Sequence, residues 1–304
     1  MRALVTGAGG FCGKALCRFL ENQGLEVFAL SSLRDGPRVF HVSAIEDEGG
    51  IREALSKIRP EFVFHLAGVS SYPEDPWQVY RVNIGFAFHL LRAMEAAGLR
   101  DAPLLLAGSC AEYGDVDRAE LPVTENHACR PLTDYGISKL AQTRLALSAS
   151  RRGHRVVAAR SSNALGPGIP GSLFLGSIAR QVADIAKGKR QAILEVGNLD
   201  TARDFIHVDD AVRCYWKLVN QPTAFGEIVN ISSGTAVPIR RLLDTLVALS
   251  GQTVSVVSRT DRMKSHDTPS FSACNRKLRA LVDEAPEFQI EKTLREVLEY
   301  ELTK

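Results

Sequence analysis

The sequence of 304 residues lacks the cysteine patterns of two protein classes. Its six cysteines form no Cys-x-x-Cys pair, and none of them stands at a zinc-ligand spacing from a histidine. These absences argue against a structural zinc ion and against a disulfide framework, because both need cysteines at recurring short spacings. We therefore expect no bound metal and a reducing, cytoplasmic location.

Long apolar runs and long runs of one charge are missing as well. No apolar run approaches the length of a membrane-spanning helix, and glycines interrupt MRALVTGAGG before an export signal could form. The 37 basic and 35 acidic side chains are spread along the chain and leave a net charge of +2. We expect no export, no membrane partner and no nucleic-acid partner, so any anion-binding site must be local.

Short apolar segments alternate with longer amphipathic stretches through the first half of the chain. This rhythm predicts an α/β fold, a Rossmann-type doubly wound parallel sheet with ligands at the carboxyl ends of its strands. We expect a dinucleotide-binding domain at residues 1–162. The loop NALGPGIPG then breaks the rhythm, and a smaller α/β substrate-binding lobe is expected at 163–304, with helix 208–220 returning to the first domain.

A glycine-rich segment, VTGAGGFCGKAL, follows the first predicted strand and opens the first predicted helix. At Gly7, Gly10 and Gly13 the missing side chain permits a positive φ and a close approach of the backbone to a pyrophosphate. The helix N-terminus adds unpaired N–H donors and a partial positive charge. Glycine-rich turns are common, but this strand–turn–helix position predicts a dinucleotide site, with Phe11 and Cys12 beside the cofactor.

The end of the second predicted strand has no acidic residue directly after it to hold the ribose hydroxyls of NAD. The sequence there is FALSSLRDG, which offers Ser31, Ser32 and Arg34. Hydroxyls and a guanidinium bind a 2′-phosphate, which a carboxylate would repel. We expect NADP(H) as cofactor. NAD(H) is the alternative, in which Arg34 is a solvated loop residue and Asp35 binds the ribose.

The segment TDYGISK holds a tyrosine and a lysine four positions apart. If a helix begins near Asp134, Tyr135 and Lys139 lie one turn apart on the same face. A nearby ammonium brings the phenol toward a working pKa, and the lysine can also hold the cofactor ribose. Ser109, past the end of a predicted buried strand, is the candidate that holds the substrate oxygen.

Together these residues resemble the extended short-chain dehydrogenase/reductase family of nucleotide-sugar enzymes. The similarity covers essentially the whole chain and occurs in the family's order, through the glycine loop, FHLAG, GSCAEYG, YGISK, NALGPG and RDFIHVDDAV. The resemblance implies hydride transfer between a nicotinamide and the C4 atom of a sugar, with Ser109 and Tyr135 at the C4 oxygen and Lys139 assisting. It also implies cofactor contacts at Leu66, Ala67 and Gly68.

Several segments resemble one subfamily, the GDP-4-keto-6-deoxy-D-mannose reductases, which yield GDP-D-rhamnose. They include GPGIPG, SIARQVADIAKGK, VGNLDTARDFIHVDD and GEIVNISSG, and so extend through the substrate lobe. In this resemblance Arg203 binds the substrate diphosphate and Asn163 helps to hold the diphosphate or sugar. A surface ion pair of Arg203 with Asp204 or Asp200 is the competing interpretation.

The substrate lobe departs from the subfamily in RMKSHDTP, where the usual Arg-Pro is missing. Arg262 or Lys264 would then supply the second phosphate contact. In HVSAIED the family's usual aspartate beside the adenine is Ala44. Ser70, after the fourth predicted strand, would face the sugar or simply end the strand.

The neighbours of Ser109 bear on the reaction. A 4,6-dehydratase of this family carries an acid/base glutamate where this chain has Ala111, and Glu112 stands one place later. Cys110 is one residue out of register with the cysteine of GDP-fucose synthases, and we interpret it as a packing residue. The sequence therefore favours plain reduction, with C4 epimerisation, reduction of a UDP- or dTDP-sugar, and a non-catalytic NADP(H) sensor as alternatives.

Two predicted helices, FAFHLLRAMEAAG and KLAQTRLALSA, carry more apolar surface than one sheet face needs. Such helices form a four-helix dimer interface in the family, so we expect a homodimer. Burial of both helices in the core of one chain is the alternative.

Overall fold

The structure is a computed structural model that describes residues 1–31, 36–70, 75–262, 268–283 and 286–304. Within these residues no helix is both long and apolar enough to cross a membrane. Three of the sequence-predicted site residues, Ser32, Arg34 and Lys264, lie outside the described residues, and the side chain of Arg262 is not described.

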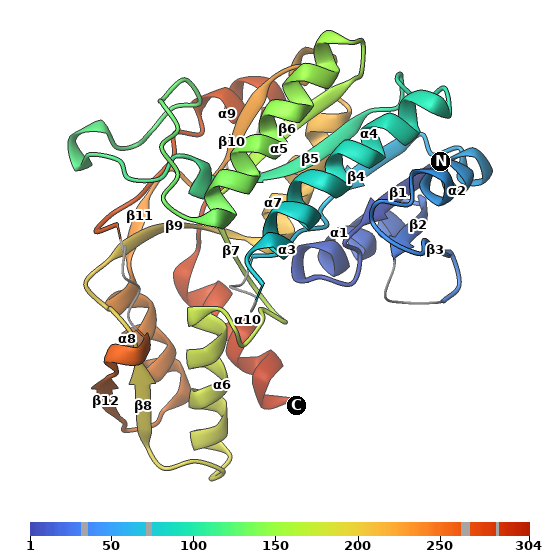
Figure 1. The fold of residues 1–304 in the computed structure, drawn as a ribbon. Helices are drawn as coiled ribbons and strands as arrows, with labels where there is room; N and C mark the ends of the chain where they lie inside the picture. Colours follow the sequence, from blue (N-terminus) through green and yellow to red (C-terminus); the bar gives the residue numbers. More distant parts are fainter. Residues whose placement is uncertain (32–35, 71–74, 263–267, 284–285) are drawn as a thin grey trace.

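A seven-stranded, fully parallel sheet forms the larger lobe (Figure 1), in the order β10-β6-β5-β4-β1-β2-β3. Its central strands are almost entirely buried, as expected of parallel strands covered on both faces. The strands are β1 (Arg2–Thr6), β2 (Glu26–Ser31), β3 (Val39–His41), β4 (Phe62–His65), β5 (Leu104–Ser109), β6 (Val156–Ser161) and β10 (Ile228–Ile231).

Helices cover both faces of this sheet and bury a separate apolar cluster on each. One cluster lies under α1 (Phe11–Asn22), α7 (Val208–Val219) and α9 (Arg276–Val282). The other lies under α2 (Glu48–Ile58), α4 (Phe86–Ala96) and α5 (Asp134–Arg151), with α4 and α5 packed side by side. The arrangement is the doubly wound sheet that the alternating pattern predicts.

The smaller lobe has its own apolar core. A three-stranded sheet is formed by β7 (Asn163–Leu165), β9 (Ala202–His207) and β11 (Ala236–Pro238), and β8 (Ile193–Val196) pairs with β12 (Ser255–Ser258). Helices α6 (Phe174–Ala186), α8 (Ile239–Ser250) and α10 (Ile290–Leu302) pack together around this core.

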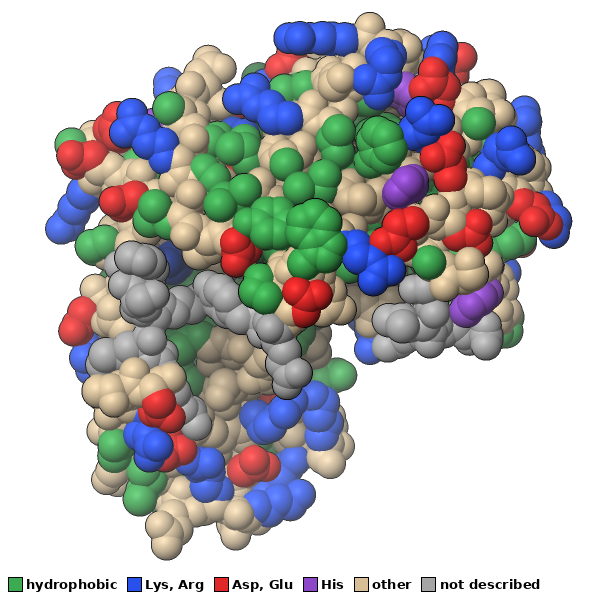
Figure 2. Space-filling view, in the orientation of Figure 1, with side chains coloured by type: hydrophobic (Ala, Val, Ile, Leu, Met, Phe, Trp, Pro, Cys, Tyr) green, Lys and Arg blue, Asp and Glu red, His purple; other side chains and the backbone are tan. Residues whose placement is uncertain are grey.

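The chain passes repeatedly between the lobes. Helix α7 packs against α1, and β10 pairs with β6, although both follow residue 163, where the sequence analysis begins the substrate lobe. The sequence analysis anticipated the return of the helix but not that of the strand. Figure 2 shows the surface indented between the two lobes, beneath the carboxyl ends of the main strands.

Candidate active site

The glycine loop joins β1 to α1 and has no room for side chains. Gly7 has a φ of +72°, and a Cβ atom there would lie 2.6 Å from the backbone nitrogen of Ala67. A Cβ on Gly13 would lie 2.0 Å from the carbonyl oxygen of Gly7, to which Gly10 N–H donates at 2.9 Å. The loop can therefore form only with glycine at Gly7 and Gly13.

The N-terminus of α1 is open to an anion. Its N-cap residue, Gly10, provides no side-chain hydrogen bond, and the first turn carries no acidic residue. The first N–H groups of the helix therefore have no capping side chain, and their partial positive charge suits a pyrophosphate. These residues fit a dinucleotide, and Phe11 beside them packs against the cores of both lobes. Burial raises the pKa of the Cys12 thiol to about 11, so this thiol is neutral.

The segment after β4 is held against α5 by a buried asparagine that the sequence analysis missed. Asn83 lies in a single π-helical turn, η1 (Arg81–Gly85), and is fully buried. Its side chain accepts a hydrogen bond from Val69 N–H at 2.8 Å and donates to the Val69 carbonyl oxygen and to Ser138 Oγ. A Cβ on Gly68 would lie 3.0 Å from Asn83 Oδ1, so the loop after Leu66 packs tightly here.

Helix α5 begins at Asp134, as the sequence predicted, and Thr133 caps it by accepting a hydrogen bond from Gly136 N–H at 3.1 Å. Tyr135 and Lys139 therefore lie one turn apart. A Cβ on Gly136 would lie 2.6 Å from the carbonyl oxygen of Ala111, which brings the first turn of α5 directly onto the segment after β5.

The Lys139 ammonium is almost completely buried, with 4% of the residue exposed. It donates to the carbonyl oxygen of Ala107 and to Gln142 Oε1, both at 2.8 Å. Burial lowers the pKa of Lys139 to about 8, while the charge of Glu112 acts in the opposite direction. The ammonium is therefore charged at neutral pH and loses its charge in a mildly alkaline range.

Ser109 ends β5 and lies against Tyr135. Its Oγ accepts a hydrogen bond from Ala111 N–H at 3.1 Å. Burial raises the pKa of Tyr135 to about 12, and a side-chain hydrogen bond with Ser109 opposes that rise. The phenol is therefore protonated at neutral pH, which suits a group that donates a proton to an oxygen becoming negatively charged.

The histidine on the neighbouring strand has a packing environment. His65 is fully buried in β4, and its Nδ1 lies 2.8 Å from Thr6 Oγ1. Burial lowers the pKa of His65 to about 3, and the charge of Lys139 adds to this effect. The imidazole is therefore neutral and supports the end of β1.

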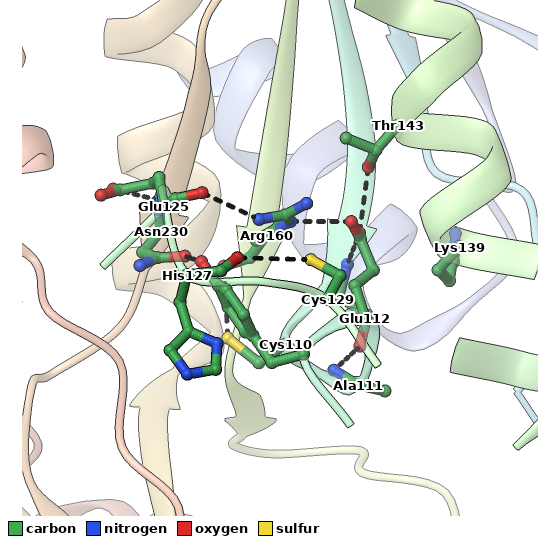
Figure 3. Close-up of polar contacts among 12 residues, drawn as sticks. Cys110, Ala111, Glu112, Glu125, His127, Cys129, Lys139, Thr143, Arg160 and Asn230 are labelled. Carbon is green, nitrogen blue, oxygen red and sulfur yellow. Dashed lines mark hydrogen bonds and ion pairs between the residues drawn. The ribbon is translucent and has the colours of Figure 1, made fainter. Parts of the chain in front are cut away.

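Glu112, whose role the sequence left open, is fully buried and points toward Arg160 and Thr143 (Figure 3). It ends the short helix η2 (Cys110–Glu112) and forms an ion pair with Arg160 of β6, with 2.7 Å between Oε2 and Nε. Cys110 is buried beside this pair, and its Sγ donates to the carbonyl oxygen of Arg160 at 3.5 Å. No signal in the local sequence links Glu112 to Arg160, because the two are 48 positions apart.

The predicted substrate residues lie on different segments of the two lobes. Asn163 is exposed and donates to the carbonyl oxygen of Asp204 at 2.9 Å, and Ser70 is exposed beyond β4. Arg203 is half-buried on β9, and its Nη1 donates to the carbonyl oxygen of Ala202. The carboxylate of Asp204 accepts from Ser233 N–H, Ser233 Oγ, Gly234 N–H and Ala273 N–H.

Comparison with known proteins gives consistent results over the whole chain. The chain is 31% identical over 301 residues to GDP-6-deoxy-D-mannose reductase from Pseudomonas aeruginosa, covering 98% of this chain and 96% of that protein. It is 28% identical to a UDP-glucose 4-epimerase from Streptomyces lividans, over 83% of this chain and 82% of the relative. Among solved structures, that of RMD from Pseudomonas aeruginosa complexed with NADPH superposes with a TM-score of 0.88, at 29% identity and 99% coverage of both chains.

The profile of one family also matches residues 3–232, which include the glycine loop, Ser109, Tyr135 and Lys139. This chain belongs to the NAD dependent epimerase/dehydratase family.

Proposed function

We propose that this protein is an NADPH-dependent reductase of the C4 keto group of a nucleotide-linked 4-keto-6-deoxy sugar. The proposed reaction converts GDP-4-keto-6-deoxy-D-mannose to GDP-D-rhamnose. The observation that carries the proposal is the pairing of a protonated Tyr135 with Ser109 and a buried, charged Lys139 beside the open N-terminus of α1. The similarity to a GDP-6-deoxy-D-mannose reductase supports the substrate.

In the proposed reaction, bound NADPH supplies a hydride to C4 of the sugar. Ser109 holds the carbonyl oxygen, and Tyr135 donates its proton to that oxygen as the C4–H bond forms. Lys139 then stabilises the phenolate with its positive charge and holds the cofactor ribose. The pKa of Tyr135 is raised to about 12 by burial and is not lowered by Lys139 as the sequence analysis expected, so the phenol carries its proton at neutral pH and has it available for the carbonyl oxygen.

We assign the nucleotide sugar to the lobe of residues 163–304 and the cofactor to residues 1–162. Arg203 would bind the diphosphate, since a guanidinium offers two parallel donors to phosphate oxygens. Asn163 and Ser70 are the proposed sugar contacts, and Arg262 or Lys264 the proposed second phosphate contact.

A homodimer through α4 and α5 is part of the proposal. Large apolar side chains are exposed on and beside these helices, among them Phe88 at 44%, Ile137 at 42% and Trp77 at 67%. Figure 2 shows apolar side chains gathered on this face of the larger lobe. A patch of this kind is typical of an interface, and two copies would pair their α4 and α5 helices. We further propose a cytoplasmic location, because none of the six described cysteines forms a disulfide.

The test is to mix the purified protein and NADPH with GDP-4-keto-6-deoxy-D-mannose and to follow the absorbance of the reduced nicotinamide. Stoichiometric loss of NADPH with GDP-D-rhamnose as product is the expected result. If NADPH binds and only UDP- or dTDP-linked keto sugars are turned over, the GDP assignment is wrong. The similarity to a UDP-glucose 4-epimerase makes UDP-glucose with NAD the second assay. Tight binding without turnover of any of these sugars would favour the sensor.

A further inference from the structure

The Glu112 carboxylate joins three segments of the larger lobe. Its Oε1 accepts hydrogen bonds from Ser109 N–H at 2.9 Å and from Thr143 Oγ1 at 3.0 Å. Its Oε2 accepts from Arg160 Nε at 2.7 Å. One side chain therefore contacts the end of β5, helix α5 and strand β6. Figure 3 shows its contacts with Thr143 and Arg160.

Space for this carboxylate depends on a glycine. A Cβ atom on Gly108 would lie 2.5 Å from Glu112 Oε1 and 3.2 Å from Thr143 Oγ1. Gly108 directly precedes Ser109, the last residue of β5, so the glycine beside the proposed catalytic serine also leaves room for the Glu112 carboxylate. Any larger side chain at this position would displace Glu112.

The contacts set the register of α5 against β5. Lys139 Nζ donates to the carbonyl oxygen of Ala107, and one helical turn later Thr143 donates to Glu112. Glu112 itself accepts from Ser109 N–H. Helix α5 is thus tied to the end of β5 at two successive turns, and these ties fix Tyr135 relative to Ser109.

Arg160 anchors the other side of the carboxylate in the core. Its guanidinium carbon lies 4.8 Å from the centre of the Tyr113 ring, and Tyr113 Oη donates to Asn230 of β10. The side chains of Glu112 and Arg160 are 0% and 2% exposed. A buried ion pair contributes little net stability compared with apolar packing, so its presence beneath the site calls for another explanation.

The alternative role for Glu112 is a proton shuttle to the sugar, by analogy with the glutamate of a dehydratase. Both carboxylate oxygens already accept hydrogen bonds from protein donors, and the side chain is fully buried. A group that shuttles protons to a substrate must reach it directly or through one water. The geometry therefore favours a role that acts through Ser109 and α5.

We propose, on the basis of the proposed reductase function, that Glu112 is a positioning residue whose charged carboxylate holds Ser109, Tyr135 and Lys139 in their reactive arrangement. Its negative charge also supports the Lys139 ammonium. Lys139 also acts on His65, which is neutral. Burial raises the pKa of Glu112, and the charge of Arg160 opposes that rise. Loss of the carboxylate should therefore move the deprotonation of Lys139 to lower pH.

The test compares Glu112→Gln with Glu301→Gln as a matched control. Glu301 is a buried carboxylate of α10 that contacts Lys304 at 2.7 Å and Arg180 at 3.8 Å, away from the proposed site. We expect Glu112→Gln to lower kcat at least tenfold with a smaller change in KM for the keto sugar, and to move the alkaline limb of the kcat profile to lower pH. Glu301→Gln should leave kcat and its pH profile unchanged.

A second variant, Gly108→Ala, displaces the carboxylate and keeps its charge, so a similar loss of kcat is expected. If Glu112→Gln lowers the melting temperature but retains the kcat and pH profile of the wild type, the positioning role is wrong. The proposal is also overturned if the wild type exchanges a carbon-bound hydrogen of the sugar with solvent and Glu112→Gln does not, because Glu112 would then be a proton shuttle.

The outcome can be separated from a failure of the proposed function. If the wild-type protein turns over no keto sugar, NADPH affinity is measured by fluorescence between pH 6.5 and 9.5 instead. The affinity should fall as Lys139 loses its charge, and in Glu112→Gln this fall should occur at lower pH, by about half a unit or more. An unchanged midpoint would overturn the positioning role whatever the substrate is.

Discussion

Replacement of Lys139 by methionine tests whether the buried ammonium lowers the free energy of unfolding. The side chain is almost completely buried and its pKa is lowered from 10.5 to about 8. Below pH 8 the folded protein carries this ammonium in an environment that disfavours charge, whereas the unfolded chain carries it in water. Each unit of pKa shift corresponds to about 1.4 kcal/mol, so the penalty near pH 7 is about 3 kcal/mol.

The sign of the pH dependence follows from proton binding. Because the folded-state pKa lies below the unfolded value, the unfolded chain binds more protons between pH 8 and 10.5, and the penalty disappears as pH rises through this window. The variant also loses the hydrogen bonds to Ala107 and Gln142, which lowers its stability at both pH values. The stability of the wild type relative to Lys139→Met should therefore increase by about 2–3 kcal/mol from pH 7 to pH 10.

The assay is urea unfolding of both proteins at equal concentration, at pH 7 and pH 10. It can be followed by the fluorescence of Trp216, whose ring packs edge-on against Phe62 at 4.9 Å, and by circular dichroism. Lys57→Met is the control, because this lysine is exposed and its ion pair with Glu53 lies at the surface, so its difference from the wild type should change by less than about 1 kcal/mol between the two pH values. A Lys139→Met difference that also stays constant between the two pH values would refute the reasoning.

Three further predictions concern the proposed site. Gly7→Ala should raise the Kd for NADPH at least tenfold and lower the free energy of unfolding by about 1–3 kcal/mol, because Gly7 has a positive φ and an added Cβ would meet Ala67. Fluorescence titration measures the Kd and urea unfolding the stability. An unchanged Kd would contradict the assignment of this loop to the cofactor. Tyr135→Phe should lower kcat by about 10²–10⁴-fold with NADPH affinity nearly retained, and full turnover would exclude Tyr135 as the proton donor. Ile137→Asp should yield a monomer in sedimentation, since it places a charge in the proposed interface, and an unchanged dimer would exclude this face.

Local patterns were sufficient for the features that depend on neighbouring residues. The one-turn separation of Tyr135 and Lys139 follows from their four-residue spacing once a helix begins near Asp134, where α5 starts. The cap by Thr133 was found only in the structure. The glycine loop likewise follows from spacing, because the steric demand lies within the strand–turn–helix unit itself.

Features that depend on distant segments were not predicted. Glu112 meets Arg160 across 48 positions, and Asn83 meets Ser138 across 55, so nothing adjacent in the sequence identifies either pair. Strand β10 is short, and its pairing with β6 is a long-range contact. The sequence left the role of Glu112 open, and its burial and its three donors are what point to positioning.

The repeated passage of the chain between the lobes restricts how such a protein can be re-engineered. Cutting after residue 162 would remove β10 and α7, leaving β6 as a bare sheet edge and uncovering the apolar face under α1. Bare edges and apolar faces promote aggregation. To change the sugar specificity, segments of a relative should therefore be inserted on both sides of residues 208–231, which stay unchanged. A simple exchange of C-terminal halves should yield insoluble chimeras.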